Sequence, residues 1–435
     1  MKRILCFLML ILSLLITGCS LPEIEPNYSE SDLEYLVQEK NIKKFQKAPE
    51  SYYDFVKLVQ NFSTDISNAL YEKYQTKYDR MTVSPLSIYM ALAMATSVAE
   101  TEAQNELVNL LGIPYSDIVE YTKYLFSSLN NTLKQNLKTV YTLQLSNSIW
   151  LNENLKFKQN GLNTLSNDFS VDTYQVPFSS NNSVANKAIK DYVYRNTKGL
   201  IDAEYNFDIY TLFLLINTLY LKDSWNSVGN DLSLTNEVYN FKNQNNTTKS
   251  INLLKGYYVP GKVQSGDGFE YFYTQTTRGL KLYFIKPTTK SLDEVYNNQN
   301  LNLILNDKTY NYVNSDLNEF YYTRCFFPEF DAKFDENLTE ILMEKYNVQK
   351  IFNSNYCNFD KLTDDISFVS SMIHQTKLVV DKKGIEGAAV TILGANGSAA
   401  APTNDIYYDF VIDESFGFIL TKDDVVLFSG VVNNL

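Results

Sequence analysis

The chain has few side chains that could carry out catalysis: one histidine, His374, and four cysteines. A histidine-based hydrolase would need that imidazole together with a nucleophile and an orienting acid, and no Gly-x-Ser-x-Gly nucleophile turn accompanies it. The same scarcity leaves too few soft ligands for a multi-ligand zinc or haem site. We therefore expect a protein that is not an enzyme and that binds no metal or cofactor.

The amino-acid composition further restricts the class of protein. Of 435 residues, 45% are hydrophobic and 20% are charged, with 16 Gly and 10 Pro, which is typical of a folded globular chain with a sizeable core. The formal net charge of -12 produces a field that repels phosphate backbones. Nucleic acid is therefore not an expected partner.

The first residues have the pattern of an export signal. Lys2 and Arg3 precede an apolar run over residues 4–16, which is too short to span a membrane comfortably. Ile-Thr-Gly-Cys at 16–19 is similar to the lipobox of bacterial lipoproteins, in which the cysteine receives a lipid. We expect a signal peptide over 1–18, a lipidated Cys19 with a flexible tether over 19–50, and a folded domain over 51–435. The product would be extracytoplasmic, anchored by lipid to a bacterial membrane or cell surface, or released; an ordinary secreted protein is the alternative.

The four cysteines have different expected fates. Cys6 would leave with the signal peptide, and Cys19 would carry the lipid. Cys325 and Cys357 remain in the folded domain. The sequence leaves open whether these two pair, and two free, buried thiols are the default expectation.

Periodicity predicts the elements that would position a site. Apolar residues at three- and four-residue steps from 55 to 70 predict a helix, Ser84 before Pro85 predicts the start of a buried helix, and a later helix should end at Gly112. Strand-like runs occupy 143–150, 212–220, 280–285, 378–380, 416–420 and 425–428. With helices early, strands late and no internal linker, we expect one large α+β domain.

One stretch is hard to explain as ordinary structure. Residues 387–404 read GAAVTILGANGSAAAPTN, with no charged residue and no proline before Pro402. When exposed, such a segment is an edge-pairing hazard that proteins usually blunt with charge or proline. A flexible surface loop of small residues is the simplest interpretation, but the flanking sequence favours another.

The flanking residues resemble the hinge of the serpin family, which leads into that family's reactive-centre loop. They read ISFVSSMIHQTK at 366–377 and DKKGIEGAAVT at 381–391. Further blocks resemble serpin landmarks in the expected chain order: SPLSI at 84–88, NSIW at 147–150, NTLYLKDSW at 217–225, FPEF at 327–330 and FSGVVN at 428–433. The resemblance covers about residues 50–435 and implies a fold of three β-sheets, eight or nine helices and an exposed reactive-centre loop.

The resemblance also implies a mechanism, that of a suicide inhibitor. A target serine protease attacks the loop as a substrate and forms an acyl-enzyme. The cut loop then inserts into the central sheet and distorts the protease before hydrolysis finishes, so that the protease stays covalently trapped. A cysteine protease also forms an acyl-enzyme and is a further possible target.

Insertion requires small or uncharged side chains on the buried face of the hinge. By strand alternation the odd-numbered hinge residues share one face and Glu386 lies on the other, which favours an inhibitor. Ile385 and Gly387 depart from the residues that the family prefers, and slow insertion at Ile385 would turn the inhibitor into a substrate. The resemblance assigns these residues to the hinge: Gly384, Ile385, Glu386, Gly387, Ala388, Ala389, Val390 and Thr391.

The usual family distance from Gly384 places the reactive bond between Ser398 and Ala399. Small residues around this bond suit a shallow pocket and no basic residue is present, so an elastase-like or subtilisin-like protease is expected rather than a trypsin-like one. Alternative cleavage sites remain open at Leu393, Asn396, Ala399 and Ala400.

The resemblance assigns gating roles to residues elsewhere in the chain. Ser84, Ser87, Asn217 and His374 would form the shutter, a buried polar network beneath the central sheet that controls strand opening. Trp225 would mark the breach, where insertion begins, although plain core packing is the alternative.

Two other functions remain open. A non-inhibitory serpin would act as a binding or carrier protein, and its cleavage would give no covalent complex. A surface glycan-binding lipoprotein would account for the 33 Tyr and the lipid anchor, but it would leave the hinge unexplained.

Overall fold

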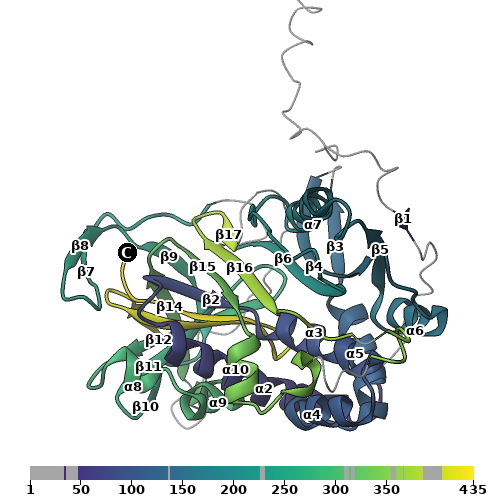
Figure 1. The fold of residues 1–435 in the computed structure, drawn as a ribbon. Helices are drawn as coiled ribbons and strands as arrows, with labels where there is room; N and C mark the ends of the chain where they lie inside the picture. Colours follow the sequence, from purple (N-terminus) through teal and green to yellow (C-terminus); the bar gives the residue numbers. More distant parts are fainter. Residues whose placement is uncertain are drawn as a thin grey trace, which may run out of the picture.

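The computed structural model describes residues 34–35, 48–135, 138–225, 231–307, 313–314, 319–353, 359–365, 367–385 and 404–435. The predicted α+β class is confirmed, because nine α-helices and three β-sheets form in this part of the chain. Figure 1 shows β17 between β6 and β16 near the middle of the molecule, with β3, β4 and β5 beyond β6.

The predicted helices form where their sequence signals place them. Helix α2 buries Val59, Ile66 and Leu70 along one stripe. Helix α3 starts after the N-cap Ser84, whose hydroxyl accepts a hydrogen bond from the Ser87 amide, and nearly all of its residues are buried. The helices are α2 (Tyr52–Tyr74), α3 (Pro85–Val98), α4 (Thr101–Leu111), α5 (Tyr115–Leu129), α6 (Gln159–Phe169), α7 (Asn182–Asn196), α8 (Leu292–Val295), α9 (Asn298–Asn306) and α10 (Thr339–Glu344), with a 3-10 turn at Lys350–Phe352.

The largest sheet has 14 strands, and each of the six predicted strand runs falls within or overlaps one of them. Its order is β1-β5-β4-β6-β17-β16-β15-β2-β20-β19-β12-β11-β10, with β3 paired to β4. The strands are β1 (Glu34–Tyr35), β2 (Arg80–Val83), β3 (Asn131–Gln135), β4 (Lys138–Asn152), β5 (Val171–Val176), β6 (Phe213–Ser224), β10 (Gln264–Gly266), β11 (Phe269–Gln275), β12 (Leu280–Pro287), β15 (Phe330–Asn337), β16 (Ile373–Val380), β17 (Gly384–Ile385), β19 (Phe416–Lys422) and β20 (Val425–Val432).

Two smaller sheets complete the fold. In the first, β14 pairs with β13, with β9 and with β18. In the second, β7 pairs with β8. These strands are β7 (Tyr239–Lys242), β8 (Thr248–Ile251), β9 (Leu254–Pro260), β13 (Val313–Asn314), β14 (Glu319–Phe327) and β18 (Asn404–Val411).

Side-chain alternation divides the core into two parts on opposite faces of the sheet. In β4, Ile149 and Leu151 belong to the main core, which includes α2 and α3, whereas Trp150 belongs to a smaller cluster with Ile189 of α7. In β6, Leu214 likewise joins the α7 cluster. Helix α7 therefore covers one face of β4 and β6, and α3 covers the other.

Candidate functional site: the opening between β6 and β16

The feature that sets this sheet apart is the short strand between β6 and β16. Strand β17 has two residues, whereas β6 has 12 and β16 has eight. Gly384 pairs with Ser224 and Ile385 pairs with Asp223 on one side, and Ile385 pairs with Val380 on the other. Among the described residues, this bridge at one end is all that joins the two long strands.

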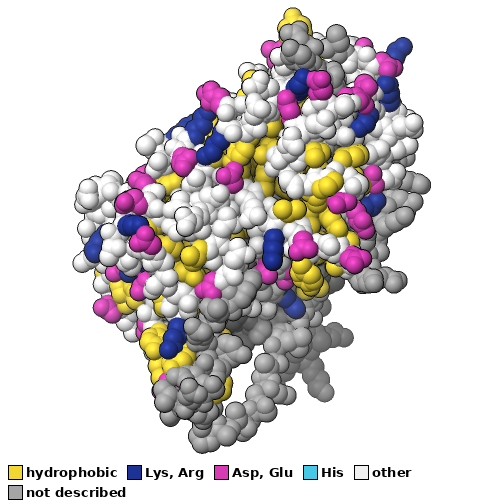
Figure 2. Space-filling model, turned by 90° about the horizontal axis from the view of Figure 1, so that it is seen from below, with side chains coloured by type: hydrophobic (Ala, Val, Ile, Leu, Met, Phe, Trp, Pro, Cys, Tyr) yellow, Lys and Arg dark blue, Asp and Glu magenta, His cyan; other side chains and the backbone are white. Residues whose placement is uncertain are grey.

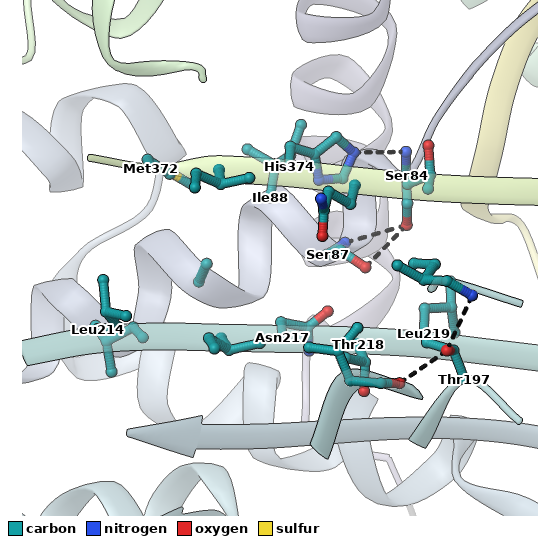
Figure 3. Close-up of a pocket in the computed structure, with 18 of the residues that line it drawn as sticks. Ser84, Ser87, Ile88, Thr197, Leu214, Asn217, Thr218, Leu219, Met372 and His374 are labelled. Carbon is teal, nitrogen blue, oxygen red and sulfur yellow. Dashed lines mark hydrogen bonds between the residues drawn. The ribbon is translucent and has the colours of Figure 1, made fainter. Parts of the chain in front are cut away.

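A cavity lies along the unbridged part of the two strands. Its volume is about 80 Å³, and its lining comes from residues 214–219 on the β6 side, residues 371–377 on the β16 side, and parts of α3 and α7. Figure 3 shows His374 of β16 and the preceding Met372 on one side, Leu214 and Asn217 of β6 on the other, and Ser87 of α3 between them. The opening is thus a slot between strands with a cavity beneath it.

Gly384 is required by close backbone contact. A Cβ atom at this position would lie 2.1 Å from the Asp223 carbonyl oxygen, so any side chain would force the two backbones apart. The turn before it is held by Asp381, whose side-chain Oδ1 accepts hydrogen bonds from the Lys383 amide (2.7 Å) and the Gly384 amide (3.1 Å). Ile385 is fully buried in the main core. The first two predicted hinge residues are therefore already seated in the sheet.

Three of the four predicted shutter residues are linked by hydrogen bonds. The Ser84 amide donates to Nε2 of His374 at 3.1 Å, and the Ser84 hydroxyl donates to the Ser87 hydroxyl at 3.0 Å. His374 lies on β16 with its side chain on the core face, because positions 374, 376, 378 and 380 of this strand are buried in alternation. This network therefore ties β16 to the start of α3.

Asn217, the fourth shutter residue, lines the same cavity but bonds elsewhere. Its side-chain Nδ2 donates to Oδ1 of Asn147 at 2.7 Å, and Asn147 in turn donates to the Phe169 carbonyl at 2.6 Å. The Asn217 Oδ1 atom is buried and has no hydrogen-bond partner among the described residues. A buried acceptor without a donor lowers the stability of the folded state. The structure thus leaves one unsatisfied acceptor facing the cavity region.

His374 is placed as a structural residue. Burial lowers the pKa of its imidazole to about 3, so the ring is neutral and can accept the Ser84 hydrogen bond at ordinary pH. The ring packs 5.9 Å from the ring of Phe334. The Nε2 lone pair is therefore occupied by the Ser84 amide, and the ring joins β16 to the residue that caps α3.

Trp225 lies at the bridged end of the opening. Its indole Nε1 donates to the Asp381 carbonyl at 2.6 Å, and its ring packs edge-on against Phe327 at 5.4 Å. Trp225 is 3% exposed, so it is also part of the core. Both roles that the sequence left open are therefore compatible with its position, since it packs in the core and holds the turn that leads into β17.

Asp223 is a member of this site that the sequence interpretation missed. Its carboxylate accepts hydrogen bonds from the Ser224 amide and the Arg278 amide, each at 2.9 Å, and burial raises its pKa to about 6. Among the described residues, Asp223 is the only Asp, Glu, Lys or Arg that is buried. The available signal was an acidic residue near the end of a largely apolar strand.

Several predicted site residues lie outside the described residues. They are Cys19, the hinge residues Glu386, Gly387, Ala388, Ala389, Val390 and Thr391, and the reactive-bond residues Ser398 and Ala399. Of the cysteine pair, Cys325 is a buried free thiol whose pKa is raised by burial, whereas Cys357 lies outside the described residues.

The described part of the chain contains neither a cluster of metal ligands nor a helix that could span a membrane. No group of three or more His, Cys, Asp or Glu residues there is arranged to hold a metal ion. Nor is any helix in the described ranges long and apolar enough to cross a membrane. Figure 2 shows acidic and basic side chains interspersed on the face seen from below, where the described residues form no single-sign patch.

Comparisons with known proteins agree with this geometry. The family described as Serpin (serine protease inhibitor) matches residues 57–435. An uncharacterized serpin-like protein of Methanosarcina acetivorans is 25% identical over 398 residues, which cover 88% of this chain and 86% of the relative. Alpha-1-antiproteinase of Rattus norvegicus is 22% identical over 388 residues, which cover 85% and 87%.

Solved structures have the same fold. The thermophilic serpin tengpin in its native state matches with a TM-score of 0.70 and 22% identity, covering 92% of this chain and 98% of that chain. Thyroxine-binding globulin in complex with thyroxine matches with a TM-score of 0.69 and 21% identity, covering 88% and 99%. The family match spans most of the chain, and the chain belongs to the serpin family.

Proposed function

We propose that this serpin inhibits serine proteases of elastase-like or subtilisin-like specificity by trapping them as a covalent acyl complex. The family as a whole is described by serine protease inhibition. The observation that carries the proposal is the slot between β6 and β16, which is bridged at one end by β17 and open along the cavity. An unfilled strand position in the middle of a large sheet is the physical requirement for a loop that inserts after cleavage.

The register of β17 predicts how the loop would fill the slot. Strands β17 and β6 are antiparallel: Gly384 pairs with Ser224, and the next residue, Ile385, pairs with Asp223. If the loop extended β17 in the same register, Thr391 would lie opposite Asn217 on β6. On the other side, extension from the pair Ile385–Val380 would place Thr391 opposite His374 on β16. The two independent extrapolations therefore bring the same hinge residue to the predicted shutter.

The direction and chemistry of such a strand fit the slot. β17 is antiparallel to both β6 and β16, so a continued strand makes ordinary ladders with each neighbour. Ile385 faces the core, so by alternation Gly387, Ala389 and Thr391 would face inward. All three are small, and the Thr391 hydroxyl could donate to the unpartnered Asn217 Oδ1.

The covalent step would follow ordinary acyl transfer. The hydroxyl of the protease serine attacks the carbonyl carbon of Ser398, an ester bond forms, and the amine of Ala399 leaves with the proton that the protease base carries. Hydrolysis of the ester would regenerate the protease. Insertion of the loop into the slot competes with that hydrolysis and, when it is faster, leaves the ester intact.

The proposed location is extracytoplasmic. The basic residues and apolar run before Cys19 support export and lipid anchoring of the mature chain. Such an anchor would hold the inhibitor at a membrane or cell surface, where secreted serine proteases, and also cysteine proteases, would reach its loop.

A panel of proteases tests the proposal. The full chain is incubated with elastase-like, subtilisin-like and trypsin-like enzymes, and the products are separated by denaturing electrophoresis. A band near the summed masses, together with a released peptide that starts at Ala399, is the expected result. Loop cleavage with no such band for any protease would contradict inhibition and favour a binding or carrier role.

A further inference from the structure

An aromatic surface lies on the small sheet formed by β9, β14 and β18. We call it the tyrosine platform. Pairing across the three strands brings its residues into two adjacent rows on one face, because residues paired across a sheet share a face. The platform consists of Tyr258 and Pro260 from β9, Tyr322 and Arg324 from β14, and Tyr407 and Asp409 from β18.

The rings of the platform contact one another. Tyr407 lies 5.6 Å from Tyr322 with an interplanar angle of 22°, and 4.8 Å from Tyr258 at 62°. Tyr407 is 55% exposed and Tyr258 is 40% exposed, although both are large side chains on a sheet face. The three rings therefore form a continuous aromatic surface that is open to solvent.

Arg324 fixes the position of this surface. Its guanidinium lies 4.6 Å from the ring centre of Tyr258, and it forms a forked ion pair with Asp409, with contacts of 2.9 Å and 3.0 Å from Nη2. The forked geometry holds both charged groups in place. Side chains that are already ordered lose little conformational entropy when a partner binds. Tyr and Arg are also the residues most enriched at the centres of protein interfaces.

The platform is close in the sequence to the segment that a target protease would attack. Strand β18 begins at Asn404, and the proposed reactive bond follows Ser398 in the same chain. Six residues of chain reach at most about 20 Å. A protein interface of ordinary size covers about 800 Å² on each partner, which is about 30 Å across. A protease whose active site holds the reactive bond would therefore bring its neighbouring surface within reach of the platform.

We propose that the tyrosine platform is an exosite that binds the target protease outside its active site, a role that rests on the proposed inhibitory function. The partner surface it fits is a rim that carries Arg or Lys side chains next to the protease active-site cleft. Aromatic faces attract such cations, Asp405 lies in the row beyond Tyr407 on the same face, and the chain has a net charge of -12.

Binding without chemistry tests the exosite. The full chain and its Tyr258→Ala/Tyr407→Ala double variant are titrated with an elastase and a subtilisin whose catalytic serines are replaced by alanine, so that no acyl bond can form. We expect the double variant to bind at least one of the two proteases at least tenfold more weakly than the unmodified chain. Tyr210→Ala is the matched control, because Tyr210 is 79% exposed and lies outside the platform, and its affinity should be unchanged.

The outcomes separate the exosite from the covalent mechanism. Equal affinity of the double variant and the unmodified chain, or no binding of either protease to the unmodified chain, would overturn the exosite.

Unchanged thermal unfolding of the double variant shows that its weaker binding does not result from misfolding. Arg324→Lys provides a second variant, which retains the positive charge but loses the forked ion pair with Asp409. If active proteases form no covalent complex, but inactive proteases still bind the unmodified chain more tightly than the double variant, the exosite is supported and covalent trapping is contradicted. Xylan, a polysaccharide, is titrated in parallel. If the double variant loses xylan binding while its protease binding is unchanged, the platform is a glycan-binding surface and the proposal is overturned.

Discussion

At the scale of single residues, Asp223 makes the stability of the native sheet depend on pH. Its pKa is raised from 3.8 to about 6 by burial, so the folded state holds the proton more tightly than the unfolded chain. The resulting stabilisation is complete below about pH 4 and is lost as the pH rises through about 6. It amounts to about 3 kcal/mol at most, since one pKa unit corresponds to about 1.4 kcal/mol.

The Asp223→Asn variant tests this dependence. The side chain of the variant cannot titrate at this position. As the pH rises from 4 to 7, the unmodified chain should therefore lose up to about 3 kcal/mol of stability relative to the variant. Urea unfolding at several pH values measures the difference. The exposed carboxylate variant Asp405→Asn is the control, and a difference that does not change with pH would contradict the assignment.

His374 has the opposite pH dependence. Burial lowers its pKa to about 3, so its contribution to stability is present above the unfolded pKa of about 6.5 and is lost as the pH falls towards 3. His374→Leu would also leave the Ser84 amide without its acceptor, at a cost of about 1–3 kcal/mol near neutral pH. Calorimetry should show a lower unfolding temperature at neutral pH, with the gap to the unmodified chain narrowing in acid. A variant as stable as the unmodified chain at pH 7.5 would show that the Ser84 bond contributes nothing.

At the scale of elements, β17 is the start of the strand that we expect to insert. Ala389 should face the main core and the adjacent Ala388 should lie on the opposite face of the sheet, as alternation from the buried Ile385 requires. Ala389→Arg should therefore block insertion and turn the inhibitor into a substrate, whereas Ala388→Arg should remain an inhibitor. The number of inhibitor molecules consumed per protease trapped measures this difference, and equal values for the two variants would contradict the register.

Gly384 offers a second test at this scale. A side chain there would collide with the Asp223 backbone, so Gly384→Val should detach β17 from β6 and slow insertion. Lys383→Ala, an exposed position in the same turn, is the matched control. We expect several-fold more cleaved, uncomplexed chain with Gly384→Val than with the control, as seen by denaturing electrophoresis.

The elements that follow local rules could be predicted from the sequence. The start of α3 at Ser84 and Pro85 and the end of α4 before Gly112 depend on capping within a few residues, and both are confirmed. Serpin membership and the α+β fold, expected from the hinge and the landmark blocks, are confirmed as well.

The features that depend on distant contacts could not be predicted in the same way. The place of β17 between β6 and β16 depends on pairing with strands that are distant in the sequence in one case and reversed by a turn in the other, which no local pattern encodes. Asn217 was expected in one network with His374, yet its side-chain amide donates to Asn147, because β4 and β6 pair directly at this position. The burial of Asp223 likewise depends on the turn at Arg278, which is 55 residues away.

At the scale of the whole molecule, the open slot predicts that cleavage stabilises the chain. An inserted strand would complete the ladder between β6 and β16 and fill the cavity, whereas the described residues of the uncut chain leave both incomplete. The cleaved chain should unfold roughly 20 °C or more above the uncut chain, which corresponds to about 15–20 kcal/mol, since the entropy of unfolding near the midpoint is about 2.1 cal/mol/K per residue. Scanning calorimetry of both forms measures the shift, and a non-inhibitory carrier is expected to show little gain.

The central claim is that the loop enters the slot between β6 and β16, and hydrogen–deuterium exchange before and after loop cleavage tests it most directly. Peptides that cover Phe213–Ser224 and Ile373–Val380 should exchange much more slowly after cleavage, because the new strand would hydrogen-bond to both, while peptides from β19 and β20 should be unchanged. Unchanged exchange in β6 and β16 after complete cleavage would contradict the account.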